Sequence, residues 1–195
     1  MASPELGVQL RSAVKILVDS LINPLSSRVL LDRLYEVNRK RRVNLPTIVI
    51  HLVSNLDKIE DLIRVCVDNV LEGVTSDPGL IFRGENINTK ILAELCKMVC
   101  GTFVQALIKN EIIKLISKKK SEAKIRGHTQ QLLNKIFNEM DYFPEAFTRL
   151  CAVVDKKIFS RYPDISAIGM ANLVFLRFIF PVMIETSTSV IAKYP

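Results

Sequence analysis

The chain has 195 residues, of which 49% are hydrophobic and 24% are charged, a composition that excludes a disordered protein. Seven glycines and eight prolines are too few for an all-β fold with many tight turns. The length suits one domain, and we expect a single helical domain over residues 1–195. The formal net charge of +7 admits nucleic acid, an anionic membrane or an acidic protein surface as the partner.

Helical hydrophobic periodicity dominates the first part of the chain. It predicts amphipathic or apolar helices around residues 14–21, 29–37, 48–56 and 59–70. Asn23-Pro24 separates the first two of these helices, and Pro46 precedes the third, which is where helix boundaries are expected.

Residues 72–84, with the sequence EGVTSDPGLIFRG, interrupt the helical pattern. Asp77-Pro78-Gly79 is a strong turn signal, so this segment is predicted to be a loop. Within it, Arg83 stands between an apolar run and Gly84. This pattern suggests that the apolar residues anchor the loop while the Arg83 side chain is free to point outward. Composition alone favours an ordinary arginine on a surface loop.

A second helical series follows the loop. Asn88 or Thr89 can cap a long helix that ends at the basic run Lys118–Lys120. Further helices are predicted over residues 129–140, 144–158 and 165–180, of which the last is the most apolar. No alternation typical of a strand is present, so the predicted fold class is all-α, an irregular helical bundle.

Several enzyme classes lack their usual sequence signals. The chain has no phosphate-binding glycine loop and no G-x-S-x-G motif. His51 is expected to be a core or half-buried residue and His128 to lie in a polar linker, so a hydrolase with a histidine base is not supported. The four cysteines form no Cys-x-x-Cys pair, so we expect reduced core thiols and no metal site.

The most apolar run, residues 173–184, is expected to be too short to span a bilayer, and no signal peptide is recognised. We therefore expect a cytoplasmic protein. The same run contains Arg177, whose buried charge would be costly without partners. Its side chain either extends to the surface or donates to backbone carbonyls of a neighbouring loop.

Residues 172–182, NLVFLRFIFPV, resemble the signature of the Ras-type GTPase-activating domains (RasGAP domains), which centres on Phe-Leu-Arg followed four residues later by Pro. The stretch LIFRG, with NTK at the next helix start, is similar to the arginine-finger loop of that family. Residues 161–169, RYPDISAIG, resemble the neurofibromin-like branch. The motif-bearing part covers residues 75–184, and the resemblance implies a helical bundle of the RasGAP type.

The resemblance also implies roles for the matched residues. Arg83 would be the finger inserted into the nucleotide site of a GTPase, and Arg177 would hold the finger loop by bonding its backbone. Phe82 would anchor this loop, and Gly84 would let its backbone approach the partner closely.

Three signature residues complete the match. Leu176 would face the GTPase near its switch region, whereas Phe175 would pack in the core. Pro181 is the proline that ends the signature.

The implied function is stimulation of GTP hydrolysis by a Ras-like small GTPase in its GTP-bound form. A guanidinium delivered in trans stabilises the charge that develops on the phosphoryl oxygens. GTP and Mg belong to the partner, so the chain would be an activator rather than an enzyme and would need no cofactor of its own. Recruitment to the membrane face where the GTPase sits, through flanking domains, stays open.

The chain departs from the family pattern at two places. Glu85 puts an acid where an asparagine is usual, so replacement by asparagine is expected to raise stimulation or leave it unchanged. After Pro181 the sequence VMIETSTS replaces the usual Ala-Ile and second Pro, and the chain stops at Pro195. We therefore expect a bundle that is truncated at its C-terminal end.

Two other interpretations remain open at this point. A pseudo-GAP or scaffold module would bind a small GTPase or other proteins without stimulating hydrolysis. A basic helical domain would contact nucleic acid or membrane through Arg39–Arg42 and Lys118–Lys120. Both basic runs lie at predicted helix ends, where the helix dipole favours cations, so we expect no nucleic-acid partner.

Overall fold

The structure, a computed structural model, describes residues 4–39, 43–74, 77–116 and 122–193. These residues form helices joined by short connections, without a strand among them, so the all-α prediction is confirmed. Residues 40–42 of the first basic run and the whole of Lys118–Lys120 lie outside the described residues.

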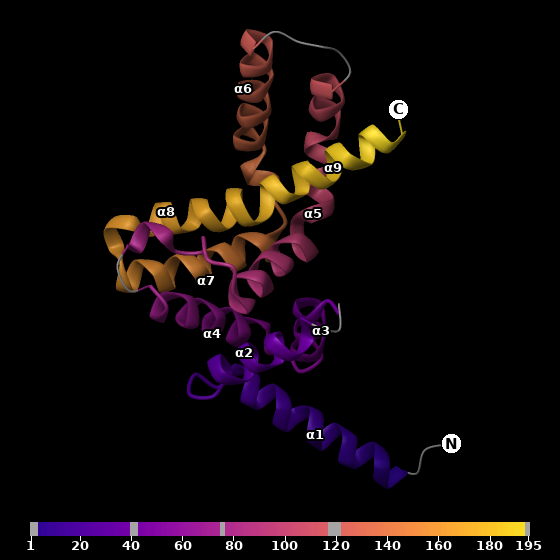
Figure 1. Cartoon of the computed structure of the whole chain (residues 1–195), viewed down its shortest axis with the longest axis vertical. Helices are drawn as coiled ribbons and strands as arrows, with labels where there is room; N and C mark the ends of the chain where they lie inside the picture. The colour runs from indigo at the N-terminus through magenta and orange to yellow at the C-terminus, as the bar shows by residue number, and fades with distance from the viewer. Residues whose placement is uncertain (1–3, 40–42, 75–76, 117–121, 194–195) are drawn as a thin grey trace.

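The N-terminal part consists of four helices. They are α1 (Pro4–Ile22), α2 (Ser27–Asn38), α3 (Leu45–Ser54) and α4 (Ile59–Glu72). α1 extends away from the rest of the molecule, and its C-terminal half packs against α2, α3 and α4 (Figure 1). Accordingly Val18 and Leu21 are fully buried, whereas Val8 and Leu10 are exposed.

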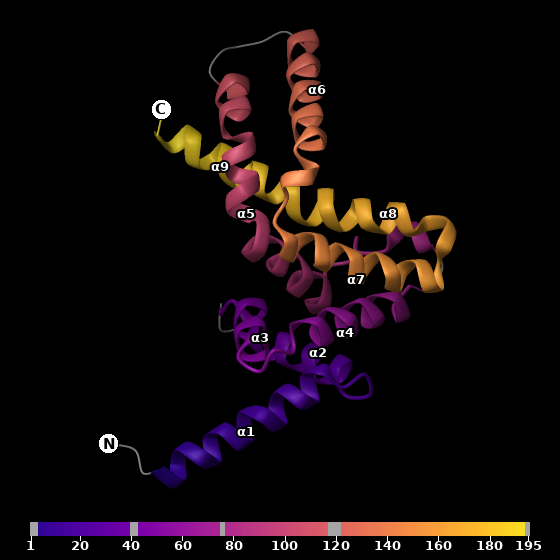
Figure 2. The ribbon, with the colours of Figure 1, turned by 180° about the vertical axis from the view of Figure 1, so that it is seen from behind.

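The long helix α5 (Ile87–Ile116) is the centre of the molecule. It packs against α2, α3 and α4, and also against α6 (Glu122–Asn138), α7 (Glu145–Arg161) and the C-terminal helix (Figures 1 and 2). The residues that fill these contacts form one connected hydrophobic core, which runs from Val18 on α1 to Val182 near the C-terminus.

Two predicted helix starts were wrong. The side chain of Asn86, and not of Asn88 or Thr89, accepts the Thr89 amide at 2.8 Å and caps α5. α6 begins at Glu122, so His128 lies on a helix and not in a linker. Its polar first turns contain the Glu122–Arg126 ion pair, the kind of i,i+4 contact that supports a helix without an apolar face.

The prediction for His51 was also wrong, because this side chain is exposed on α3. The core positions of that helix are Val49, Ile50 and Val53. The cysteine prediction agrees with the structure more closely: Cys66, Cys96 and Cys100 are buried and Cys151 is half-buried, all as free thiols.

The last helix is longer than predicted. α8 (Ser166–Ala171), the π-helix η4 (Asn172–Ile179) and α9 (Phe180–Lys193) follow one another without a break, past the predicted end at Phe180. The Phe180 amide bonds the carbonyl oxygen of Phe175, five residues back. This widened turn immediately precedes Pro181, which has no amide hydrogen and would crowd the carbonyl four residues back in a regular α-helix.

The π-helix changes which residues face the core. Buried positions are five residues apart from Leu173 to Phe178 and then four apart to Val182. Phe178 is 1% exposed, whereas Phe175 is only half-buried beside the rings of Phe137 and Phe180. The expectation that Phe175 packs in the core is therefore corrected: it lies at the edge of the core, and Phe178 occupies the interior.

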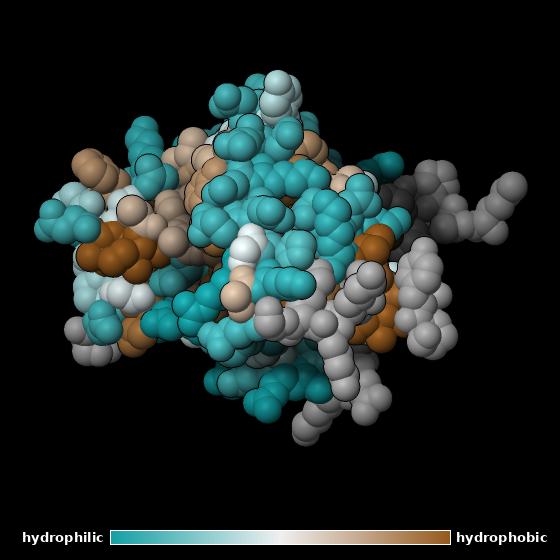
Figure 3. Space-filling model, turned by 90° about the horizontal axis from the view of Figure 1, so that it is seen from above, coloured by the Kyte–Doolittle hydropathy of each residue, from teal (hydrophilic) through white to brown (hydrophobic). Residues whose placement is uncertain are grey.

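The length argument against a membrane span does not hold for the whole helix. Residues Ile87–Leu115 and Pro163–Ala192 are both long and apolar enough to cross a bilayer by length and composition. The central helix of a soluble core has the same property. Seen from the α5–α6 end, the surface is mostly hydrophilic, with hydrophobic residues gathered in separate patches toward the sides (Figure 3).

Candidate functional site

Loop 77–86 is attached to the core by the two apolar residues that precede Arg83. Ile81 and Phe82 are 0% and 1% exposed. Before them, Asp77 accepts the Gly79 amide at 2.8 Å and so begins the short 3-10 helix η1 (Pro78–Leu80). The Arg83 amide then donates to the carbonyl oxygen of Leu80 at 2.9 Å, which closes a turn.

Phe82 adopts a left-handed backbone conformation, with φ of 61°. This region is unfavourable for a bulky side chain, and such conformations persist where the surrounding structure enforces them. Because the Phe82 ring is buried, the unusual backbone turns the next residue, Arg83, outward. Loop 77–86 therefore stores local strain at the position where a functional side chain would be presented.

Arg177 on η4 binds the backbone of this loop. Its Nε donates to the carbonyl oxygen of Phe82 at 2.6 Å, and its Nη2 donates to the carbonyl oxygens of Arg83 and, at 3.0 Å, of Gly84. The Arg177 side chain is 17% exposed, so it does not extend freely into solvent. Of the two arrangements open from the sequence, the structure has the one in which this guanidinium bonds a neighbouring loop.

Asn172 holds the first half of the same loop, a contact that sequence reasoning missed. Its amide nitrogen donates to the carbonyl oxygens of Gly79 at 3.0 Å and Ile81 at 2.9 Å. Asn172 and Arg177 are five residues apart, a spacing that places them on one face of a π-helix but not of an α-helix. The π-helix thus brings both donors to the loop.

As a result, every backbone carbonyl oxygen from Gly79 to Gly84 accepts a hydrogen bond. Asn172 supplies the donors for two of them, Arg177 for three, and the Arg83 amide supplies the one for Leu80. Because these carbonyl oxygens already accept hydrogen bonds within the protein, the loop would gain no hydrogen bonds by opening to water. The side chains of Asn172 and Arg177 therefore hold the backbone on both sides of Arg83 in place.

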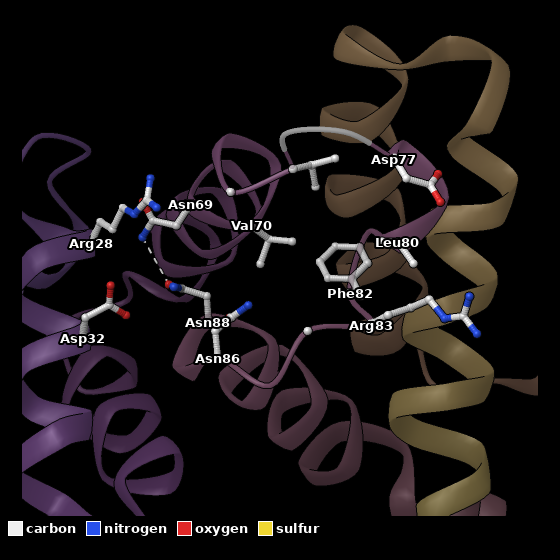
Figure 4. Close-up of a pocket in the computed structure, with 13 residues that line it drawn as sticks. Arg28, Asp32, Asn69, Val70, Asp77, Leu80, Phe82, Arg83, Asn86 and Asn88 are labelled. Carbon is white, nitrogen blue, oxygen red and sulfur yellow. Dashed lines mark hydrogen bonds between the residues drawn. The ribbon is translucent and has the colours of Figure 1, made fainter.

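The side chain of Arg83 is exposed and makes no hydrogen bond or ion pair with another described residue. It extends away from Arg28 and Asn69, which lie at the far side of a cleft of about 480 Å³ (Figure 4). Gly84 follows with an ordinary negative φ, and a Cβ there would meet only the Asn86 side chain at 3.6 Å. None of the described residues therefore requires a glycine at this position.

Glu85 does not stand free beside Arg83, which corrects the expectation drawn from its charge. Its Oε1 accepts from Nη1 of Arg177, and its Oε2 lies 3.5 Å from Nζ of Lys90. The hydrogen bond from Arg177 is the main reason why the pKa of this carboxyl lies below its usual range. Glu85 is thus part of the support of the loop, so the expected gain from Glu85→Asn loses its basis.

The other predicted residues occupy η4 and its C-terminal boundary. Leu176 is 38% exposed and available to a partner. Pro181 is the second residue of α9, just after the π-helix, and lines a second, smaller cleft together with Arg177. The roles assigned to Leu176 and Pro181, like those of Phe82, Arg83, Gly84 and Arg177, stay predictions.

Comparison with known proteins gives distant relatives. The chain is 24% identical over 177 residues to the Disabled homolog 2-interacting protein of Mus musculus, across 82% of this chain and 15% of that protein. The proteins of the same name from Rattus norvegicus and Homo sapiens are equally similar, with 18% and 15% of their lengths covered. The chain therefore spans less than a fifth of these relatives. No protein-family profile matches it.

Proposed function

We propose that this chain is a GTPase-activating domain of the Ras type, which stimulates a GTP-loaded Ras-like GTPase by inserting Arg83 in trans. One observation carries the proposal: an exposed arginine without a partner among the described residues lies on a loop whose carbonyls from Gly79 to Gly84 are all bonded. Such an arginine is free at its tip and fixed at its base. Both properties are needed to place a cation beside a transferring phosphoryl group.

Two further points support this proposal. The Phe-Leu-Arg signature and the loop motif resemble the family in sequence, and Arg177 of the signature bonds the backbone of the loop. The distant similarity to the Disabled homolog 2-interacting proteins agrees, at a coarse level, with a RasGAP relationship. Assignment to the neurofibromin-like branch depends only on residues 161–169 and is part of the proposal.

In this function the chain acts as an activator of a partner's reaction. The GTPase would hold GTP and Mg, and Arg83 would reach into its site while Leu176 contacts its surface. The place of action would be the cytoplasm, at the membrane face that carries the GTPase.

The test is single-turnover GTP hydrolysis by a panel of Ras-like GTPases, with and without the chain, together with binding to each GTPase loaded with a GTP analogue. Stimulation that disappears in Arg83→Ala while binding persists supports the proposal. Binding by the wild-type chain without stimulation of any GTPase would instead establish the pseudo-GAP alternative. Absence of both binding and stimulation would overturn the proposal.

A further inference from the structure

Glu85 belongs to a chain of polar side chains that extends beyond the loop and its signature helix. Its second carboxylate oxygen faces Nζ of Lys90 at 3.5 Å. Nζ of Lys90 in turn donates to the hydroxyl of Tyr35 at 2.6 Å and lies 4.9 Å from the centre of the Tyr35 ring. The order of contacts is therefore Arg177, Glu85, Lys90, Tyr35, which we call the Tyr35 network.

The Tyr35 network joins parts of the chain that are far apart in sequence. Arg177 lies on η4, Lys90 in the first turns of α5, and Tyr35 on α2. α2 precedes the motif-bearing part of the sequence, which begins at residue 75. A residue without any place in the recognised motifs is thus connected, through two ionic side chains, to the arginine that holds the loop.

Each contact in the network restricts a side chain that would otherwise be mobile. Glu85 is 66% exposed and Lys90 is 39% exposed, and long exposed side chains lose considerable rotamer entropy when they are held in one position. An isolated surface pair of this kind has little effect. Here Lys90 is fixed by both the hydroxyl and the ring of Tyr35, so it offers Glu85 a cation whose position is already determined.

The carboxylate of Glu85 then completes the surroundings of Arg177. The other acceptors of this guanidinium are three neutral carbonyl oxygens, so Glu85 is the group that balances its charge. As a consequence of these contacts, the hydrogen bond from Arg177 lowers the pKa of Glu85, and the hydrogen bond with Tyr35 raises the pKa of Lys90.

We propose that Tyr35, Lys90 and Glu85 are positioning residues which act through Arg177 to hold loop 77–86 in the conformation that presents Arg83. The inference rests on the proposed function for its consequence, the stimulation of a GTPase. The positioning of the loop itself can be measured without any GTPase.

The first experiment measures hydrogen exchange of the Arg83 amide, which donates to Leu80 in the turn, by NMR of the whole chain. The variants are Tyr35→Phe, which removes only the hydroxyl, Lys90→Met and Glu85→Gln. The matched control is Glu145→Gln, which breaks an exposed carboxylate–arginine pair on α7, away from the loop.

We expect exchange of the Arg83 amide to accelerate about 5-fold in the three network variants, because opening of the loop becomes easier, and to stay at the wild-type rate in the control. Wild-type exchange rates in Tyr35→Phe and Glu85→Gln would overturn the proposal. So would equal acceleration in the control variant, because the effect would then not be specific to the network.

The second experiment separates positioning from general stability. With a GTPase that the wild-type chain stimulates, the network variants should lower the maximal stimulated rate roughly 10-fold and change the half-saturating concentration of the chain little, because misplacement of Arg83 affects the transition state more than docking. The double variant Glu85→Gln with Lys90→Met should lose no more than Glu85→Gln alone, since both act on one chain of contacts. If the losses of stimulated rate in the two single variants add up in the double variant, Lys90 does not act through Glu85, and the proposed order of contacts is wrong.

The two experiments keep the inferences distinct. If the wild-type chain stimulates no GTPase, the proposed function fails, while the exchange measurement still decides whether the Tyr35 network holds the loop. If the wild-type chain stimulates hydrolysis and the network variants match it in both rate and exchange, only the positioning role is overturned.

Discussion

Nε of Arg177 donates to the carbonyl oxygen of Phe82 at 2.6 Å. This bond holds the one residue of the loop that has a left-handed backbone, with φ of 61°, directly before Arg83. The direction in which the Arg83 side chain extends is therefore determined by Arg177, which lies on η4 and is 95 residues after Phe82. Changes at η4 should reach Arg83 through this contact, even though the two guanidinium groups do not bond each other.

Replacement of Arg83 by alanine tests the finger directly. Arg83→Ala should leave thermal unfolding unchanged because the side chain is exposed, while GTPase stimulation falls by about 10³-fold, the lower end of the effect known for fingers supplied in trans to Ras. Arg83→Lys should restore little, because an ammonium lacks the planar fork of donors. The measurement is the single-turnover rate of GTP hydrolysis by the GTPase at a saturating concentration of each variant. A loss of only a few-fold in Arg83→Ala would show that another group supplies the charge.

Arg177→Ala should weaken both function and stability. Three loop carbonyls lose their donor, which is expected to lower the free energy of unfolding by about 1–3 kcal/mol. Arg149→Ala, which removes an exposed arginine on α7, is the matched control and should stay within about 0.5 kcal/mol of wild type. Urea denaturation of both variants gives the comparison, and equal stabilities would contradict the role of Arg177 in holding the loop.

The two phenylalanines of η4 test the π-helical register. Phe178→Ala should lower the free energy of unfolding by about 3–5 kcal/mol, as expected for a fully buried ring. Phe175→Ala should have a clearly smaller effect, because this ring is half-buried at the edge of the core. Thermal or chemical unfolding distinguishes them. The reverse order would mean that the regular α-helical register, with Phe175 inside, is the correct one.

The lowered pKa of Glu85 predicts a stability contribution that depends on pH. Because the pKa is lower in the folded chain than in the unfolded chain, the carboxylate stabilises the fold above its unfolded pKa of about 4.3, and this contribution disappears as the pH falls through the folded value. The group is 66% exposed, so the contribution is at most about 1 kcal/mol.

The measurement is the free energy of unfolding of wild type and Glu85→Gln from pH 7 to pH 2. The wild-type chain should be the more stable of the two at neutral pH, and the curves should converge in acid. A constant difference across this range would show that ionisation of Glu85 does not contribute.

Local sequence pattern was sufficient to predict the helical fold class and the loop that interrupts it. Apolar residues at helical spacing recur along most of the chain, and the Asp77-Pro78-Gly79 turn breaks them at one place, because these properties depend on residues that are neighbours in sequence. Arg83 could be recognised as unusual for the same reason, since its apolar and glycine neighbours adjoin it. The start of α6 was missed because its first turns are polar and carry no hydrophobic period.

Tertiary structure decided the surroundings of the loop. The sequence by itself left Arg177 with two possible arrangements, and only the folded chain shows that it bonds the backbone next to Arg83. The contacts of Asn172 with Gly79 and of Glu85 with Arg177 also join residues that lie far apart along the chain, so neighbouring residues did not indicate them. The physical reason is the five-residue turn of η4: a π-helix depends on packing and on the following proline, and it rotates side chains away from the faces that a 3.6-residue period predicts.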